Sequence, residues 1–320
     1  MDSSNLTTAL KEEALRLGFD LAGATAAEVP PTFEHFRQWL TDGFAGEMRY
    51  LAERFDAYCD PNRVLDGVRG ILMLGVNYRT VEPMALAPGY ARVSRYAWGG
   101  DYHEAVRRRL HKLADFHRRL TPAARVRGVV DTAPLLERAL AAQAGLGWIG
   151  KNTMLINRRC GSWLFLAALL TTEELRPSES TKTDMCGDCR ACLDACPTGA
   201  LIAPYWLDAR KCVSYLTIES RGAIPAEYRA ACGDRIFGCD ACQEICPWNR
   251  RTPPSPEPAF QPAQGRNPLA LSDLRAIDEA EFRGRFRHTP LWRARRTGLL
   301  RNAAVVAENH ARGSSSEKPP

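Results

Sequence analysis

Two runs of cysteine constrain this chain more than any other feature of its sequence. The first run, residues 186–197, reads CGDCRACLDACP and has the C-x2-C-x2-C-x3-C-P spacing with which bacterial ferredoxins hold iron–sulfur clusters. The second run, residues 239–247, reads CDACQEICP and lacks a first cysteine, because Ile236 stands at that position. Cys212 lies between the two runs and is the obvious replacement. The cysteines therefore make two complete sets of four.

The division into sets follows from how such runs bind metal. In two-cluster ferredoxins the fourth cysteine of each run binds the other cluster. This rule predicts two 4Fe–4S clusters, one held by Cys186, Cys189, Cys192 and Cys246 and the other by Cys196, Cys212, Cys239 and Cys242. Zinc sites are one alternative, but they usually take separated C-x2-C pairs. Disulfides are another, and they depend on the compartment.

The N-terminus and the hydropathy indicate that compartment. Residues 1–19 are polar and amphipathic, without the apolar core and cleavage site of a signal peptide. No segment approaches the run of about 20 apolar residues that crosses a membrane. We therefore expect a soluble cytoplasmic protein, in which clustered cysteines are metal ligands rather than disulfides. The other cysteines, Cys59, Cys160 and Cys232, are expected to be buried apolar thiols.

The periodicity of the chain predicts mixed structure before the cysteines and helices after them. Helices are expected over residues 3–17, 33–40, 47–55, 101–120, 134–144 and 299–309, and buried strands over 71–76, 126–130, 154–156 and 163–171, the last two as a pair. This alternation predicts an α/β or α+β domain over residues 1–175. We assign residues 176–250 to a two-cluster domain, 251–268, with six prolines, to an extended linker, 269–310 to a basic helical segment and 311–320 to a disordered tail.

The net charge of +6 is unevenly distributed. Between Glu281 and Arg301 the only acid is Glu281 itself, whereas the arginines number seven: Arg283, Arg285, Arg287, Arg293, Arg295, Arg296 and Arg301. Such a cluster is either a solvated face or a phosphate-binding surface, because arginine suits bidentate phosphate contacts. Charge alone does not decide between them.

The size of the first domain implies more than electron transfer. A ferredoxin needs about 60 residues, so the additional α/β domain suggests that electrons are delivered to something bound there. Asp131 is the best candidate acid, because it follows a predicted buried strand, where open sheets place ligand-contacting groups. Partial burial would raise its pKa and suit it to donate a proton. The alternative is that Asp131 caps the helix that starts near Pro134.

Two further motifs are candidate cofactor sites. Residues 147–152, GWIGKN, could lay backbone against a flat cofactor, but their spacing is not the G-x-G-x-x-G of dinucleotide sites. Asp101-Tyr-His103 matches the start of the D-x-H-x-x-G motif that ligates cobalamin through histidine. The glycine is missing, because Val106 stands in its place. We therefore reject His103 as an axial ligand and expect an ordinary helix residue.

Six segments of the chain resemble epoxyqueuosine reductases. They are VVDTAPLLER (129–138), GLGWIGKNT (145–153), GSW (161–163), CPTGAL (196–201), CVSYLTIE (212–219) and GCDACQEICPWN (238–249). The resemblance extends from the N-terminus to about residue 309. It implies an α/β (α+β) cobalamin-binding domain, a ferredoxin-like domain with two 4Fe–4S clusters and a short α-helical C-terminal extension. It also implies the last step of queuosine synthesis, reduction of the epoxide of epoxyqueuosine in tRNA.

The resemblance assigns roles to individual residues. Asp131 would protonate the departing epoxide oxygen. Cobalamin, bound without a histidine ligand, would contact Arg54, Ser94, Tyr96, Asp131, Lys151, Asn152, Ser162 and Ser214. The cluster that includes Cys212 would lie nearer the corrin. The clusters would pass single electrons to the cobalt, supplied by an external donor such as flavodoxin or ferredoxin.

The resemblance also implies a partner, the anticodon stem-loop of tRNA. The arginines of residues 283–301, and the basic helix at residues 107–119, then become expected phosphate contacts. Longer family members continue into helical repeats, of which this chain has about one and a half helices. The family favours a monomer.

Two other functions compete with this reading. One is a corrinoid reductive dehalogenase-like enzyme, which would commonly carry an export signal and would leave the arginines without a role. The other is a non-catalytic iron–sulfur electron carrier, which would not need the first 175 residues.

Overall fold

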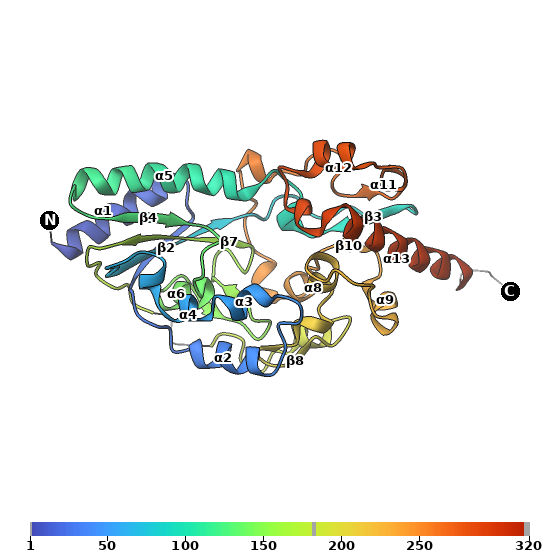
Figure 1. Cartoon of the computed structure of the whole chain (residues 1–320), viewed down its shortest axis with the longest axis horizontal. Helices are drawn as coiled ribbons and strands as arrows, with labels where there is room; N and C mark the ends of the chain where they lie inside the picture. The colour runs from blue at the N-terminus through green and yellow to red at the C-terminus, as the bar shows by residue number, and fades with distance from the viewer. Residues whose placement is uncertain (1, 181–183, 317–320) are drawn as a thin grey trace.

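The computed structural model describes residues 2–180 and 184–316, and its largest sheet has four strands in the order β1-β2-β7-β4 (Figure 1). Neighbouring strands are antiparallel throughout. The strands are β1 (Leu21–Ala26), β2 (Gly70–Asn77), β7 (Leu164–Thr171) and β4 (Val126–Val129). The sequence predicted all of these except β1. It did not predict that β4 is an edge strand, exposed over Arg127 and Gly128.

The central strands are apolar because helices cover both faces of the sheet. Successive side chains of a strand point to opposite faces, so β2 contributes to two cores. Leu72 and Leu74 pack with α1 (Ser3–Arg16) and α5 (Tyr102–Leu120). Ile71 and Met73 pack instead with α6 (Glu137–Gln143). Figure 1 shows α1 and α5 along one face of the sheet and α6 along the other.

The remaining elements of the first 175 residues are short. The predicted helix over 47–55 is divided into α3 (Arg49–Glu53) and α4 (Phe55–Cys59), preceded by α2 (Phe33–Thr41). The predicted pairing of 154–156 with 163–171 is wrong. Instead, β6 (Leu155–Ile156) pairs with β5 (Trp148–Ile149), because the tight turn after Gly150 returns the chain on itself. Cys160 is buried as predicted, whereas Cys59 is only half-buried at the end of α4.

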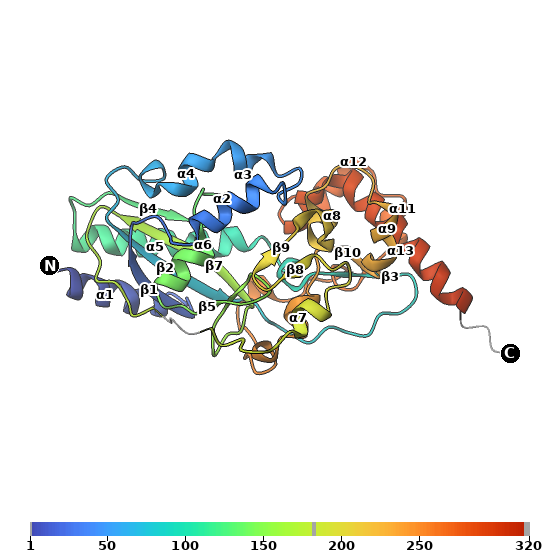
Figure 2. The same ribbon diagram turned by 90° about the horizontal axis from the view of Figure 1, so that it is seen from below.

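The cysteine region lies between the four-stranded sheet and the C-terminal helices (Figure 2). Its elements are α7 (Ala191–Asp194), β8 (Leu201–Ala203), β9 (Trp206–Leu207), α8 (Val213–Ile218), α9 (Ala226–Cys232), β10 (Arg235–Phe237) and α10 (Ala241–Glu244). Most of these elements span fewer than seven residues, as expected of a chain folded around metal ligands. Cys232 is buried, as predicted.

A small second sheet joins the predicted segments to one another. Its order is β10-β3-β11, with β3 (Tyr90–Val93) parallel to β10 and antiparallel to β11 (Leu269–Ala270). The three strands come from the first region, the cysteine region and the C-terminal segment. They share a core that includes Ile236, the residue that replaces the missing cysteine. The first region, the cysteine region and the C-terminal segment therefore pack against one another through this sheet.

Two predictions about the C-terminal part need correction. The proline-rich segment is not a loose connector, because Phe260 in the short 3-10 helix Pro258–Phe260 is 4% exposed and belongs to the core of the four-stranded sheet. The predicted tail begins too early: α13 extends from Arg295 to Ser316. Residues 317–320 lie outside the described residues. Before α13 come α11 (Ser272–Arg275), α12 (Glu279–Phe286) and a 3-10 helix (Pro290–Ala294).

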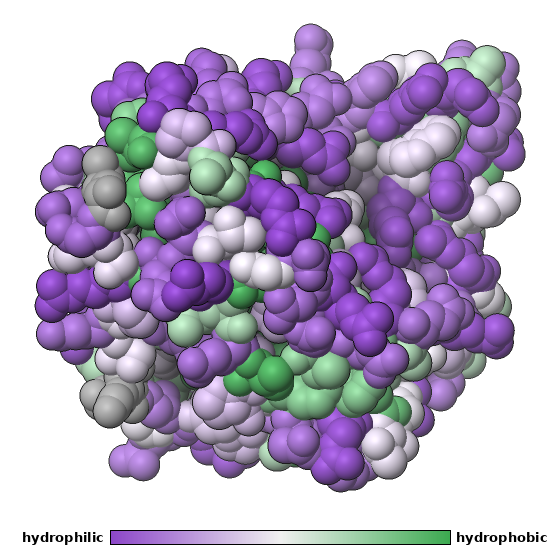
Figure 3. Space-filling view, turned by 60° about the vertical axis from the view of Figure 1, so that its left-hand side comes forward, coloured by the Kyte–Doolittle hydropathy of each residue, from purple (hydrophilic) through white to green (hydrophobic). Residues whose placement is uncertain are grey.

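A mostly polar surface is expected when the apolar side chains pack into the cores of the two sheets. Figure 3 shows a face that is hydrophilic over most of its area, with apolar side chains in small separate patches. In the described part of the chain, no helix combines the length and the hydropathy of a transmembrane span.

Candidate active site

A cavity of about 400 Å³ lies where the first region meets the cysteine region. Its apolar wall includes Tyr96, Tyr102 and Phe165. Six of the residues predicted from the sequence to contact a cofactor line it: Ser94, Tyr96, Asp131, Asn152, Ser162 and Ser214. The same cavity is lined by the second predicted set of cysteines, Cys196, Cys212, Cys239 and Cys242. The structure therefore brings the candidate acid and one complete set of four thiols to a single cavity.

The other four cysteines lie around a second cavity, of about 260 Å³. It is lined by Cys186, Cys189, Cys192 and Cys246. The division of the eight thiols between the two cavities is thus the division that the ferredoxin rule predicts.

The thiols are chemically suited to a polynuclear centre. Burial and the nearby thiols of Cys246 and Cys186 raise the pKa of Cys192 to about 11. Burial likewise raises the pKa of Cys242 well above its ordinary value, and Cys212 and Cys239 add to the effect. Such groups are held as thiolates only when positive metal replaces their protons. Both sets therefore fit a metal cluster.

Contacts between distant segments fix the loop that carries Cys239. Gly238 has a φ of +72°, and a Cβ there would lie 2.5 Å from that of Ser94, so this position requires glycine. The adjacent Asp240 carboxylate accepts hydrogen bonds from Ser94 Oγ (2.5 Å) and from the Arg95 amide (2.7 Å). Burial raises the pKa of Asp240, against the effect of these bonds. Ser94 thus attaches the cysteine loop to the first region.

Two of the predicted cofactor contacts do not line the first cavity. Lys151 lines the second cavity instead, where its Nζ donates to the carbonyls of Gly187 and Cys189. Those carbonyls attract the ammonium group away from the first cavity. Arg54 donates to the carbonyl of Thr132 at 3.2 Å, beside Asp131. Asn152 lines both cavities and donates to the Cys242 carbonyl at 3.3 Å.

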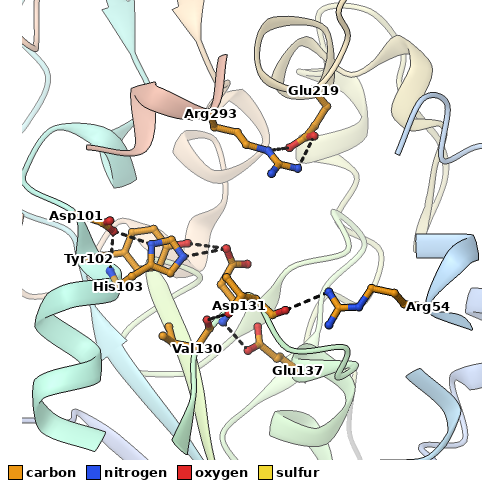
Figure 4. Close-up of polar contacts among 10 residues, drawn as sticks. Arg54, Asp101, Tyr102, His103, Val130, Asp131, Glu137, Glu219 and Arg293 are labelled. Atoms are coloured by element: carbon orange, nitrogen blue, oxygen red, sulfur yellow. Dashed lines mark hydrogen bonds and ion pairs between the residues drawn. The ribbon is translucent and has the colours of Figure 1, made fainter. Parts of the chain in front are cut away.

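Asp131 is held in a tight turn directly after β4 (Figure 4). Its φ of +57° lies in the left-handed region, which aspartate tolerates better than most residues. The Asp131 amide donates to Glu137 Oε1 at 3.0 Å, and its carboxylate Oδ2 accepts from the Tyr102 hydroxyl at 3.1 Å. His103 Nε2 lies 3.1 Å from the same oxygen. The side chain faces the cavity and is 59% exposed.

The charges around Asp131 contradict one prediction. The hydrogen bond with His103 lowers the pKa of Asp131, although burial acts in the opposite direction. Burial would lower the pKa of His103, but its bonds to Asp101 and Asp131 raise it to about 9. The raised carboxyl pKa belongs instead to Glu137, where burial and the charge of Asp131 bring it to about 8. At neutral pH the proton therefore resides on His103 and the negative charge on Asp131.

His103 is consequently not an ordinary helix residue. It lies in the first turn of α5, where Asp101 caps the helix by accepting from the His103 amide at 3.0 Å. Asp101 Oδ1 also lies 2.6 Å from His103 Nδ1. The sequence signal for His103 is Asp101-Tyr-His103, a pattern that the cobalamin motif interprets only as a metal ligand. Tyr102, His103 and Glu137 are the site residues that sequence reasoning did not find.

The arginines near the C-terminus divide into two groups. Arg293 makes a bidentate pair with Glu219, at 2.9 and 2.8 Å, across the site from Asp131 (Figure 4). Arg285, Arg296 and Arg301 donate to backbone carbonyls, so these four side chains hold the fold together. The side chains of Arg283, Arg287 and Arg295 are exposed, and the described residues offer these side chains no hydrogen bond or ion pair, although the Arg295 guanidinium lies over the Trp292 ring at 5.7 Å.

Two family models match the chain. One, described as 4Fe-4S double cluster binding domain, matches residues 185–249, and the other, described as Epoxyqueuosine reductase QueG, DUF1730, matches residues 59–132. Epoxyqueuosine reductase of Pseudomonas aeruginosa is 42% identical over 313 residues, covering 96% of this chain and 86% of that protein. The chain belongs to the epoxyqueuosine reductase family. The Escherichia coli reductase is 38% identical, with 97% and 82% coverage.

Solved epoxyqueuosine reductases share the fold. A crystal structure of an epoxyqueuosine reductase with an epoxyqueuosine-modified tRNA-Tyr stem loop has a TM-score of 0.90 and 30% identity, covering 97% of this chain and 83% of that one. The Bacillus subtilis reductase, described with its catalytic aspartate loop swung out of the active site, has a TM-score of 0.89 and 29% identity with the same coverage. Family membership makes the chain an oxidoreductase and favours neither the dehalogenase-like nor the electron-carrier function.

Proposed function

We propose that this epoxyqueuosine reductase converts epoxyqueuosine in tRNA to queuosine, the last step of queuosine synthesis. The observation that carries the proposal is the single cavity that Asp131 shares with four cysteines. A reduction needs electrons and protons at one place, and this cavity brings a carboxyl group and a predicted cluster site together. An electron carrier would need only the thiols.

Two 4Fe–4S clusters are the proposed electron path. Cys186, Cys189, Cys192 and Cys246 would hold the outer cluster, and Cys196, Cys212, Cys239 and Cys242 the inner one. Cys189 is exposed, whereas the thiols of the inner set are half-buried, so electrons would enter at the outer set. We propose a small one-electron carrier such as flavodoxin or ferredoxin as the donor.

Cobalamin is the proposed cofactor of the first cavity. The walls fit a flat macrocycle: Tyr96 and Phe165 offer apolar surface, while Ser94, Ser162, Ser214 and Asn152 offer short polar groups. When bound, cobalamin supplies a strongly reducing cobalt centre for epoxide chemistry. We propose that cobalamin is held here without a histidine ligand. Arg54 could reach the cofactor only from beside the Asp131 turn.

Asp131 is the proposed proton donor to the epoxide oxygen. The Tyr102 hydroxyl and His103 orient its carboxylate, and Glu137 fixes the backbone of its turn. The Bacillus subtilis relative with its catalytic aspartate loop swung out supports a turn that can open around the substrate. The tRNA partner is supported by the related complex with a stem loop, and the exposed Arg283, Arg287 and Arg295 would contact its phosphates. We propose a cytoplasmic monomer.

The decisive experiment is anaerobic turnover. Protein with both clusters intact is loaded with cobalamin, reduced, and offered an anticodon stem-loop that contains epoxyqueuosine. We expect queuosine, detected by mass spectrometry of the digested RNA. Asp131→Asn should still bind cobalamin, followed by its absorbance, but lose roughly 10²- to 10⁴-fold in turnover.

The matched control is Asp115→Asn, an exposed aspartate on α5. It should retain wild-type turnover. No conversion by the intact wild-type protein contradicts the proposed function. Full turnover by Asp131→Asn contradicts only the assignment of the acid.

A further inference from the structure

The balance of the proposed reaction requires two protons at one oxygen, and this inference rests on that proposed function. Removing the epoxide oxygen breaks two C–O bonds, forms one C=C bond and releases water. Two electrons from the one-electron donor and two protons complete the balance. Asp131 carries at most one proton at a time, so the site needs a group that protonates it again between the two transfers.

The contacts of Asp131 identify the side from which a proton can arrive. Both Tyr102 and His103 contact the same oxygen, Oδ2, each at 3.1 Å. Oδ1 accepts no hydrogen bond from the described residues, and Asp131 lines the cavity, while Figure 4 shows the carboxyl group directed toward Tyr102 and His103 through its other oxygen. The carboxyl torsion of aspartate is soft, so a proton received on Oδ2 can be presented to the cavity by rotation. One oxygen is thus placed to receive and the other to deliver.

The side chain of Asp131 is itself 59% exposed on its cavity face, which cobalamin and the substrate would cover when they fill the cavity. His103 would then connect this carboxyl group to solvent. Its Nε2 faces Asp131, and its Nδ1 lies 2.6 Å from Asp101 Oδ1. The side chains of His103 and Asp101 are 20% and 27% exposed. Tyr102 cannot take the same role, because burial and the charge of Asp131 raise its pKa far above neutrality. A row of three groups therefore leads from the surface to the cavity.

The other charges near this row belong to neighbouring elements. Glu137 of α6 lies under the Asp131 turn, Arg293 acts on Asp131 across the site, and Arg107, one turn along α5, acts on Asp101. Arg138 also acts on Glu137, and the hydroxyls of Tyr50, Tyr58 and Tyr96 lie within reach of the Asp131 charge. The two acids that contact His103 favour its protonated form.

We propose that His103 protonates Asp131 between the two proton transfers and is itself protonated from solvent beside Asp101. His103 acts through Asp131 and does not touch the substrate. Tyr102 keeps the carboxylate in place while the proton moves.

The test removes the imidazole and supplies it from outside. His103→Ala should lower single-turnover rates by roughly 10²-fold, the usual size of a lost proton transfer. Added imidazole should restore at least a tenth of the wild-type rate, and buffers of similar size without a titratable ring nitrogen should not. His103→Gln, which keeps a hydrogen-bond donor without an exchangeable charge, should remain slow. The control is His111→Ala, an exposed histidine on the same helix.

A second readout does not depend on turnover. In histidine-labelled protein without cobalamin, the NMR titration of His103 should show a midpoint that falls when Asp131 is changed to Asn.

The pH dependence of turnover is a third readout. Wild-type turnover should decline as the pH rises through the titration of His103, and His103→Gln should lose that decline.

The outcomes separate the two proposals. If wild-type protein makes no queuosine, the proposed function fails, and this inference fails with it. If wild-type protein turns over normally and His103→Gln matches it, only this inference is overturned. A slow His103→Ala that imidazole cannot restore, with a His103 titration independent of Asp131, shows a purely structural histidine and also overturns it.

Discussion

Glu137 shows how a single half-buried acid can make the stability of this protein depend on pH. Its pKa rises from an ordinary 4.5 to about 8, through burial first and then through the charge of Asp131. Between those values the unfolded chain has lost the proton and the folded chain retains it. The free energy of unfolding should therefore fall as pH rises from about 4.5 to about 8.

The prediction is that Glu137→Gln flattens this dependence. Glutamine retains an oxygen that can accept from the Asp131 amide but does not titrate. Chemical denaturation of the protein without cobalamin, between pH 5 and pH 8, measures the slope. Glu53→Gln, an exposed glutamate on α3, should behave like the wild type. Equal slopes in wild type and Glu137→Gln would assign the proton to another group.

The roles that could be predicted from the sequence are those of residues that lie in short motifs. The cysteine spacing alone divided eight thiols into two sets, and the structure places those sets at two cavities. The partners of Asp131 were not predicted, because His103 is 28 positions away in the sequence. Burial alone would raise the pKa of Asp131, but the contact with His103 lowers it, so the expected direction was wrong.

At the scale of elements, the long apolar or amphipathic runs were predictable and the short strands were not. β2, β7, α1 and α5 have strong periodic patterns, and each lies near its expected position. β3, β10 and β11 are two to four residues long and acquire their strand geometry from partners far along the chain. The antiparallel order of the main sheet could not be predicted either, because the hydropathy pattern of the sequence shows neither β1 nor which strands pair.

The proline-rich segment provides a test at this scale. Its Phe260 contacts the core between the sheet and α5, and stacks edge-on against Phe165 at 5.1 Å between ring centroids. Phe260→Ala should therefore destabilise the protein by about 3–5 kcal/mol, measured by denaturant unfolding. Arg251→Ala, exposed in the same segment, should change stability by less than about 0.5 kcal/mol. If Phe260→Ala lowers the free energy of unfolding by less than about 1 kcal/mol, the segment is instead the extended linker predicted from the sequence.

At the scale of the whole molecule, we propose that two basic segments that are far apart in the sequence form one surface. His288 Nδ1 lies 3.5 Å from Glu104 Oε1, which joins the end of α12 to the first turn of α5. Figure 1 shows α12 and α5 on the same side of the molecule. The exposed cations of this surface are Arg107, Arg108, Lys112, Arg118 and Arg119 on α5 and Arg283, Arg287 and Arg295 near the C-terminus. Because α5 begins at Tyr102 and His103, this surface leads to the Asp131 site.

Salt dependence of RNA binding measures whether this surface contacts phosphates. Arg283→Ala/Arg287→Ala/Arg295→Ala removes three exposed cations that make no ion pair with the described residues. Each lost phosphate contact should reduce the slope of log affinity against log salt by about 0.7–0.9, so the triple variant should lose about 2 to 3. The control is Arg69→Ala/Arg125→Ala/Arg176→Ala, at the end of the main sheet away from Asp131. If both triple variants keep the wild-type slope for an anticodon stem-loop, the arginines form a solvated face, and tRNA must bind elsewhere.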